Sequence, residues 1–374
     1  MRALLLLAVV ACGNGMHVDV DKVSEAEART FVDGFLKVAH SPCTVEAVEP
    51  MLDTAALGSR LIDLPSSVKG PARELAFKAT QRQHSFAQMV CGWIGASADA
   101  KLKLITFVDG APIVRGLWKP KDTTVVTYWK LFLGKRKSDG KVLLDDIYSY
   151  ADGFNVAQNL NDFMIAGDEA GVVKAQDFVS EIQKAKGELD RGDARGALDT
   201  LDAMGPELKK VRAVQMMRIG AAQAIGQDVY ARELHDLMAK YPNDPSVALL
   251  QIDDSVLQKD FPAALKAIDA LDQSVGGDPY QDAIRSSIYM QMGDAAKALA
   301  TAKNAVKAEP AIARTQLALL DAYALAGDFA AVRAQLDVLA KMGDLLSASA
   351  LSTIPLYEKF AQSPQFADWQ QLHP

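Results

Sequence analysis

The spacing of apolar residues changes twice along the chain. Between residues 22 and 95 apolar side chains recur at helical intervals, so three helices are expected in this region. Ser24, followed three residues later by Glu27, is typical of a capping box and predicts where the first helix begins. The second and third helices are expected near residues 45–57 and 72–93.

The period then shortens to that of strands. Asp109-Gly110 and the polar run 135–141 are typical of hairpin turns, so the strands should form an antiparallel meander. The basic tip Lys135-Arg136-Lys137 is expected to be solvated, with contact to anionic lipid as the alternative. Four strands rich in β-branched and aromatic residues are predicted, over residues 101–108, 112–118, 123–133 and 142–150.

Helices followed by a sheet indicate an α+β domain, with helices packed on a curved antiparallel meander, over residues 22–152. This element order resembles the nuclear-transport-factor-like, cone-shaped fold. Residues 153–174 are expected to be a linker with a bridging helix at 156–165 and a hinge at 167–171.

A repeat follows from about residue 175. Its turn residues recur at a nearly constant interval of about 34 residues, at Gly192, Gly226, Lys259, Gly293 and Gly327. A small or β-branched residue stands five positions after each, at Ala197, Ala231, Ala264, Ala298 and Val332.

This pattern resembles the tetratricopeptide repeat, which implies an all-α solenoid of about five helix pairs over residues 175–343. Tyr289 and Tyr323, late in the first helices, also fit the family. The chain departs from it at Gln251 and Arg285, where leucine is usual, and in lacking the leading tryptophan and Leu-Gly pair. Residues 344–374 are expected to form a helical cap over the last repeat, plugged by Phe360, Phe366 and Trp369.

The N-terminal residues are expected to direct export. Arg2 precedes nine apolar residues and Cys12, the composition of a secretory signal. Residues 9–12, Val-Val-Ala-Cys, resemble a bacterial lipobox, which implies removal of residues 1–11, lipidation of Cys12 and a tether over residues 12–21. Gly13 resembles the outer-membrane sorting signal of Gram-negative lipoproteins. A plain signal peptide and a wrongly assigned start are the alternatives.

Cleavage at this point leaves two cysteines besides Cys12. Exported proteins reach an oxidising compartment, so a disulfide between Cys43 and Cys91 is predicted. Two buried free thiols are the alternative, because cysteine packs as a small apolar side chain.

Composition and the absence of known motifs argue against several classes of function. A net charge of −7 argues against a nucleic-acid partner. No glycine-rich phosphate loop or nucleophile elbow is present. We therefore expect no catalytic residue, no cofactor and no metal. None of the histidines has metal-ligand spacing to another: His17, His40, His84, His235 and His373.

One set of residues in the α+β domain could form a small-molecule pocket. Asp146, Tyr148 and Tyr150 share one face of a predicted strand, and His84 lies on the third predicted helix. An acid and two tyrosines could bind a ligand or transfer protons. The simpler interpretation is a solvated or internally bonded face.

The tetratricopeptide resemblance also implies a concave groove lined by the first helix of each repeat. Residues 175–345 hold 19 basic and 25 acidic side chains, a balance of −6 that favours basic or neutral partners. The groove positions form three rows: Lys186, Asp253, Ser287 and Asp321; Ser246, Tyr280 and Arg314; Gln223 and Met290.

The function predicted from these features is a non-enzymatic scaffold of the bacterial cell envelope. It would be lipid-anchored in the outer membrane and bind a protein or peptide in the groove. Two alternatives are a small-molecule isomerase, hydrolase or binding protein built on the α+β domain, and a purely structural part of an envelope assembly.

Overall fold

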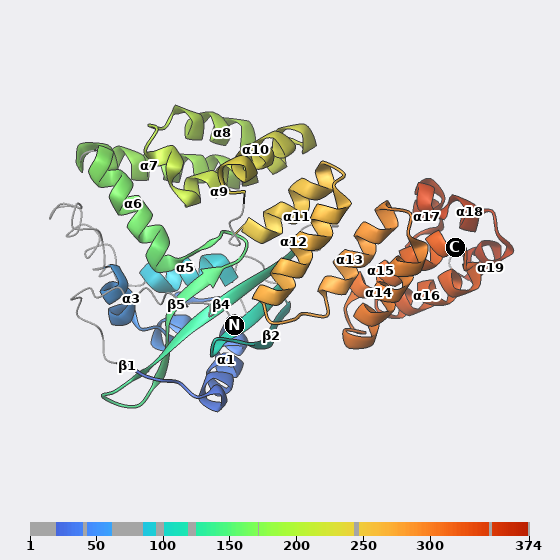
Figure 1. Ribbon diagram of the computed structural model, residues 1–374, viewed down its shortest axis with the longest axis horizontal. Helices are drawn as coiled ribbons and strands as arrows, with labels where there is room; N and C mark the ends of the chain where they lie inside the picture. The colour runs from blue at the N-terminus through green and yellow to red at the C-terminus, as the bar shows by residue number, and fades with distance from the viewer. Residues whose placement is uncertain are drawn as a thin grey trace, which may run out of the picture. The chain divides into compact units, whose positions relative to one another are not determined.

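The computed structural model contains two compact units (Figure 1). The sheet and the helices up to Glu233 form the first unit, and the helices from Leu234 onward belong to the second. This division differs from the boundary near residue 175 that the repeat predicts. The structure describes residues 20–39, 43–61, 85–94, 101–118, 125–170, 172–242, 247–343 and 346–372.

An antiparallel meander forms the centre of the first unit. The predicted order of an α+β region followed by packed helices is confirmed, and two short strands, β1 and β6, are additional to the four predicted. Five strands lie side by side in chain order: β2 (Lys101–Val108), β3 (Ala111–Trp118), β4 (Val125–Arg136), β5 (Val142–Ser149) and β6 (Phe154–Asn155). The short strand β1 (Val20–Asp21) pairs with β4.

A β-bulge determines which β5 side chains face the core. Phe132 pairs with Asp146 and Leu133 with Leu144, so Asp145 is the extra residue between them. A Cβ on Gly134 would lie 2.5 Å from an Asp145 carboxylate oxygen, closer than real Cβ contacts. The glycine near the end of β4 is therefore required by the bulge across from it.

Helices cover one face of the sheet. These are α1 (Glu25–Ala39), α2 (Val45–Val48), α3 (Thr54–Leu61) and α5 (Ser85–Ile94). The predicted capping box is present, because the Ser24 backbone N–H donates to Glu27 (3.0 Å) and the Glu27 backbone N–H donates to the Ser24 hydroxyl (3.4 Å). The shared core includes Phe31, Phe35, Phe86, Val90, Trp129, Leu131, Leu144 and Ile147.

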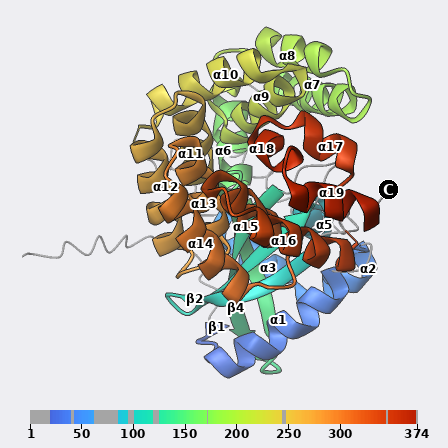
Figure 2. The ribbon, with the colours of Figure 1, turned by 90° about the vertical axis from the view of Figure 1, so that its right-hand side faces the viewer.

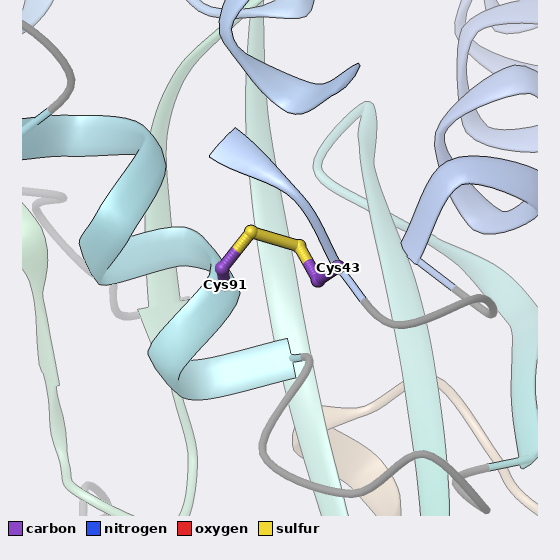
Figure 3. Close-up of a disulfide and its surroundings, with 2 residues drawn as sticks. All are labelled: Cys43 and Cys91. Carbon is purple, nitrogen blue, oxygen red and sulfur yellow. A yellow bond between two sulfur atoms is a disulfide. The ribbon is translucent and has the colours of Figure 1, made fainter. Parts of the chain in front are cut away.

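A disulfide joins Cys43, just before α2, to Cys91 on α5 (Figure 3). The two residues are 48 positions apart in the sequence and their Cα atoms are 5.4 Å apart. Closing a loop of this length restricts the unfolded chain and typically contributes about 2–4 kcal/mol to stability. The bond links the helices that cover the sheet.

The first unit continues into a run of helices. They are α6 (Val156–Ala170), α7 (Val172–Asp190), α8 (Ala194–Ala203), α9 (Arg212–Ile225) and the first half of α10 (Gln227–Lys240). The bridging helix is longer than predicted, because α6 continues through residues 167–170, which were expected to form a hinge.

Three helix pairs and a cap follow in the second unit (Figure 2). The second helices of these pairs begin at Phe261, Ala295 and Phe329, which are equally spaced along the chain. The pairs are α11 (Ala248–Leu257) with α12 (Phe261–Ser274), α13 (Gln281–Gln291) with α14 (Ala295–Ala308), and α15 (Ala313–Ala326) with α16 (Phe329–Lys341).

The same type of turn joins four of the helix pairs, α7–α8 and the three of the second unit. Each turn has a left-handed residue and then an aspartate whose carboxylate caps the next helix. The aspartate N–H donates to the carbonyl five residues earlier, as in a Schellman motif. The turns are Gly192-Asp193, Lys259-Asp260, Gly293-Asp294 and Gly327-Asp328, with capping distances of 2.9, 3.1, 3.1 and 3.1 Å.

The turn between α9 and α10 differs. Gly226 has φ 151° and ψ 168°, a conformation largely restricted to glycine, and α10 begins at Gln227. Asp228 therefore lies inside the helix instead of capping it. Ala231 is half-buried, whereas the equivalent residues of the other four pairs are fully buried.

The C-terminal helices cover the last pair, as the sequence predicts. They are α17 (Ala348–Thr353), the 3-10 helix η4 (Pro355–Tyr357), α18 (Glu358–Ala361) and α19 (Pro364–Leu372). Phe360, Phe366 and Trp369 are buried against an apolar surface that includes Leu336 and Leu339 of α16.

Lys259 is the one lysine at a turn position that glycine holds in the other three. Its φ is 58°, and the left-handed region costs a residue with a Cβ about 1–2 kcal/mol. Part of this is offset by glycine's greater freedom in the unfolded chain. We expect Lys259→Gly to raise the free energy of unfolding by about 0.5–1 kcal/mol, measured by urea unfolding.

Gly293→Lys is the matched reverse change. It should lower the free energy of unfolding by about 1 kcal/mol, because Gly293 has φ 73° in the same turn. Equal effects of the two substitutions would contradict the role assigned to the left-handed residue.

Candidate functional site

The predicted groove positions of the second unit lie on α11, α13 and α15. Asp253, on α11, is exposed. Tyr280, just before α13, is buried, with 2% of its surface exposed, and so belongs to the interior. Met290 is half-buried and packs against the apolar cluster between α13, α14 and α15. The three residues therefore differ in their access to a partner.

Two further groove residues bond to each other across neighbouring pairs. The Arg314 guanidinium on α15 donates to the Ser287 hydroxyl on α13 at 2.9 Å. The Ser287 hydroxyl in turn donates to the Ala283 carbonyl of its own helix at 3.2 Å. The sequence placed Ser287 and Arg314 in different rows, and the structure brings these rows together.

Asp321, on the same face of α15, is bonded by the C-terminal cap. The Tyr357 hydroxyl of η4 donates to Asp321 Oδ1. Burial raises the pKa of Asp321, although the Tyr357 hydrogen bond and the charge of Arg314 act in the opposite direction. Burial, with the nearby Asp321 charge, also raises the pKa of Tyr357.

Tyr357 is a residue that the sequence patterns did not single out. It follows Tyr323 at the same interval by which Tyr323 follows Tyr289, so the repeat period continues into the cap. Ser287, Arg314, Asp321 and Tyr357 form a polar row across α13, α15 and η4. One end of the predicted groove is thus bonded internally.

Arg285, where the repeat family usually has leucine, forms an ion-pair cluster between α12 and α13. Its guanidinium lies 2.8 Å from Asp269, 2.9 Å from Asp272 and 2.9 Å from Asp282. These carboxylates raise the pKa of Arg285 although burial opposes them.

Arg218 of α9, two repeats before Arg285, makes the equivalent contact in the first unit. It bonds Asp202 and lies 2.9 Å from Glu233. Each arginine reaches an aspartate 16 residues earlier in the chain. That shared spacing is a signal in the sequence for charged contact between these helices.

The remaining groove positions lie outside the second unit or outside the described residues. Lys186 on α7 and Gln223 on α9 are both exposed in the first unit. Ser246, His84 and the predicted lipidation site Cys12 are not among the described residues.

The candidate pocket residues of the sheet do not lie on the face covered by α1, α2, α3 and α5. Leu131 and Ile147 pair on the core side, so Asp146 and Tyr148, the next residues along β5, point to the opposite face. Asp146 is fully buried, and its Oδ1 accepts from the N–H groups of Ile147 (2.8 Å) and Val156 (3.0 Å). Val156 is the first residue of α6, so this carboxylate holds the start of that helix.

The tyrosines of this set pack as an aromatic pair. The rings of Tyr148 and Tyr150 lie 5.0 Å apart in an edge-to-face arrangement. Tyr150 also packs edge-on against Tyr128, at 6.3 Å. The observed contacts are those of a packed sheet face.

An open hollow of about 500 Å³ lies where the described chain begins. The Arg29 guanidinium stacks over its Phe107 ring at 4.9 Å. The hollow is lined by Lys22, Val23, Ser24, Glu25, Phe107 and Gly110.

Two features missing from the described residues bear on function. They contain no cluster of three or more histidine, cysteine, aspartate or glutamate side chains able to hold a metal ion. No helix among them combines the length and apolar character needed to cross a bilayer. No known protein-family model matches the chain, and no curated protein has significant sequence similarity to it.

Asp321 and Tyr357 generate a pH-dependent prediction. Because the pKa of Asp321 is raised, the folded protein binds a proton there at a higher pH than the unfolded chain, and stability rises as the pH falls through that pKa. Asp321→Asn keeps an acceptor and removes the ionisation. We expect its unfolding free energy at neutral pH to equal or exceed that of the wild type, with the difference shrinking near the ordinary aspartate pKa of 3.8.

Tyr357→Phe serves as the contrasting variant. It leaves the half-buried Asp321 carboxylate without its hydroxyl donor and should lower the unfolding free energy at neutral pH by about 1–3 kcal/mol. Urea unfolding at both pH values measures the two effects. A Tyr357→Phe protein as stable as wild type would show that the bond contributes nothing.

Proposed function

We propose that this protein is a lipid-anchored scaffold of the bacterial cell envelope that binds a peptide or protein partner. The first helices of its tetratricopeptide-like pairs would form the binding surface. The observation that carries the proposal is the turn shared by four helix pairs, with a left-handed residue followed by a capping aspartate. A repeated turn gives successive pairs the same internal geometry, so equivalent side chains recur along one face.

Side-chain exposure along that face indicates where a partner binds. Ser287, Arg314 and Asp321 are half-buried, and they bond one another or Tyr357. Asp253 on α11 is exposed to solvent. The negative balance of the repeat region also favours a basic partner. We therefore place the first partner contact at α11, with Asp253 facing a lysine or arginine of the partner.

The enzymatic alternative has less support. Asp146, its best acid, is fully buried and accepts two backbone hydrogen bonds that fix the start of α6. Tyr148 and Tyr150 pack against each other. A carboxylate already bonded in this way is poorly placed to exchange protons with a substrate.

Asp253→Lys tests the binding surface. The full-length protein, captured with its cross-linked partner from native envelopes, should recover the partner at least tenfold less well when it carries this substitution, since a favourable charge contact of about 1.4 kcal/mol or more is replaced by repulsion. Quantitative mass spectrometry of the captured complex measures the recovery.

Asp236→Lys is the matched control, because Asp236 is exposed on α10, a second helix. This change alters the net charge equally and should leave partner recovery unchanged. Equal recovery with Asp253→Lys and wild type, or equal loss with both variants, would overturn the proposed surface.

The anchor has its own test. Intact mass of the protein from native membranes should lack residues 1–11 and include acyl chains on Cys12. Cys12→Ala should abolish both changes, because the thiol accepts the lipid. A soluble, unacylated wild-type protein would contradict the anchor and leave the binding surface to be judged by the Asp253 experiment.

A further inference from the structure

The turn between α9 and α10 lacks both features that the other four turns share. Gln227 stands where they have the capping aspartate, and Gly226 has φ 151°, whereas their turn residues have φ between 58° and 80°. The first backbone bond that holds α10 to this turn runs from the Tyr230 N–H to the Gly226 carbonyl, at 3.0 Å. Among the described residues, no aspartate side chain accepts from the α10 N–H groups that precede Tyr230. The start of α10 is therefore held by fewer bonds than the starts of α8, α12, α14 and α16.

The first half of α10 is also loosely packed. None of the residues 227–233 is buried, whereas the second half of the helix buries Leu234, Leu237 and Met238. Ala231 is half-buried, although its repeat equivalents are fully buried. A segment with few buried apolar contacts opens locally at a lower cost in free energy than a packed core helix. The equivalents of Ala231 are Ala197, Ala264, Ala298 and Val332.

The chain also divides into its two compact units within this helix, directly after Glu233. The irregular turn and the loosely packed half-helix both precede that division. A Cβ added to Gly226 would meet no atom within 4 Å, so no neighbouring side chain packs against this side of the glycine. Hinges are commonly a few residues at the end of an element that absorb a change in φ and ψ. The α9–α10 turn has the position, the packing and the backbone of such an element.

One ion-pair cluster spans the loosely packed segment. The Arg218 guanidinium of α9 lies 2.9 Å from Glu233 of α10, and it also bonds Asp202 of α8. The Arg218 and Glu233 side chains are 19% and 16% exposed, so solvent and salt screen their attraction only partly. Arg218 thus ties the first half of α10 to the two helices before it.

We propose that the α9–α10 turn is a hinge and that Arg218 is the latch that holds it. Rotation of the backbone at Gly226 would let the helices from α11 onward change direction as one body, while the turns with a capping aspartate keep their geometry. Breaking the Arg218–Glu233 ion pair would release the first half of α10. The proposal depends neither on a binding partner nor on the lipid anchor.

Distances between two spin labels, measured on the full chain by double electron–electron resonance, test the hinge. The labelled positions lie seven residues after the turn residue in three alternate pairs, and all three are exposed: Asp199 on α8, Lys266 on α12 and Ala334 on α16. Each is changed to cysteine. With Cys12 changed to serine and the natural disulfide intact, the labels attach to the two introduced cysteines.

The two label pairs differ in the turns that they span. The pair at 199 and 266 spans the α9–α10 turn, whereas the pair at 266 and 334 spans the α13–α14 and α15–α16 turns, which both have a capping aspartate. We expect the first pair to have a distance distribution about twice as broad as the second.

Two sets of variants separate the turn from the latch. Gln227→Asp with Asp228→Ala copies the turn at residues 293–295 and should narrow the 199–266 distribution to the width of the 266–334 pair. Arg218→Gln should broaden the 199–266 distribution further. Arg285→Gln, the matched change two repeats later, should leave the 266–334 distribution unchanged, because the turns there stay capped.

Equal widths for the two label pairs in the otherwise unchanged chain would overturn the hinge. A broad 199–266 distribution that the turn variant does not narrow would place the motion outside this turn and overturn the hinge as well. An unchanged width with Arg218→Gln would reject the latch. The turn variant alters two exposed residues, so it keeps the hinge testable even where Arg218→Gln prevents folding.

Discussion

The hydrogen bond from a capping aspartate to the next helix, made possible by a left-handed residue before it, is the constraint on which the helical half depends. Free backbone N–H groups at a helix start need acceptors, and the aspartate supplies one while its own N–H closes the preceding helix. Four turns repeat this arrangement. Small or β-branched residues five positions after the turn residue then let the paired helices pack closely, and these residues are fully buried in all four pairs.

The order of an antiparallel meander followed by helix pairs was largely predictable, because it follows from patterns within short stretches of the sequence. Strand alternation, turn residues and the repeat period are short-range properties, and they gave the meander and the helix pairs. The bulge at Asp145 was not predictable, since it depends on pairing with Gly134 across the sheet. The hinge predicted at residues 167–171 is wrong for residues 167–170, which continue α6. A single glycine, here at position 167, is tolerated inside a helix.

The candidate site shows a different limit. Spacing identified Ser287, Arg314 and Asp321 as groove positions, yet it could not show that they bond to each other and to Tyr357. Such contacts join residues 27 and 36 positions apart and depend on how helix pairs stack. An arginine at position 285, where the repeat family usually has leucine, is likewise explained only by its ion pairs with Asp269, Asp272 and Asp282.

The division between the two units falls inside a helix. The first unit ends at Glu233 and the second begins at Leu234, both within α10. Cutting there would leave residues 227–233 on one fragment and 234–240 on the other, each far below the roughly 12–15 residues that an isolated helix needs. A fragment that ended at Glu233, or one that began at Leu234, would therefore carry a frayed half of α10 at its cut end.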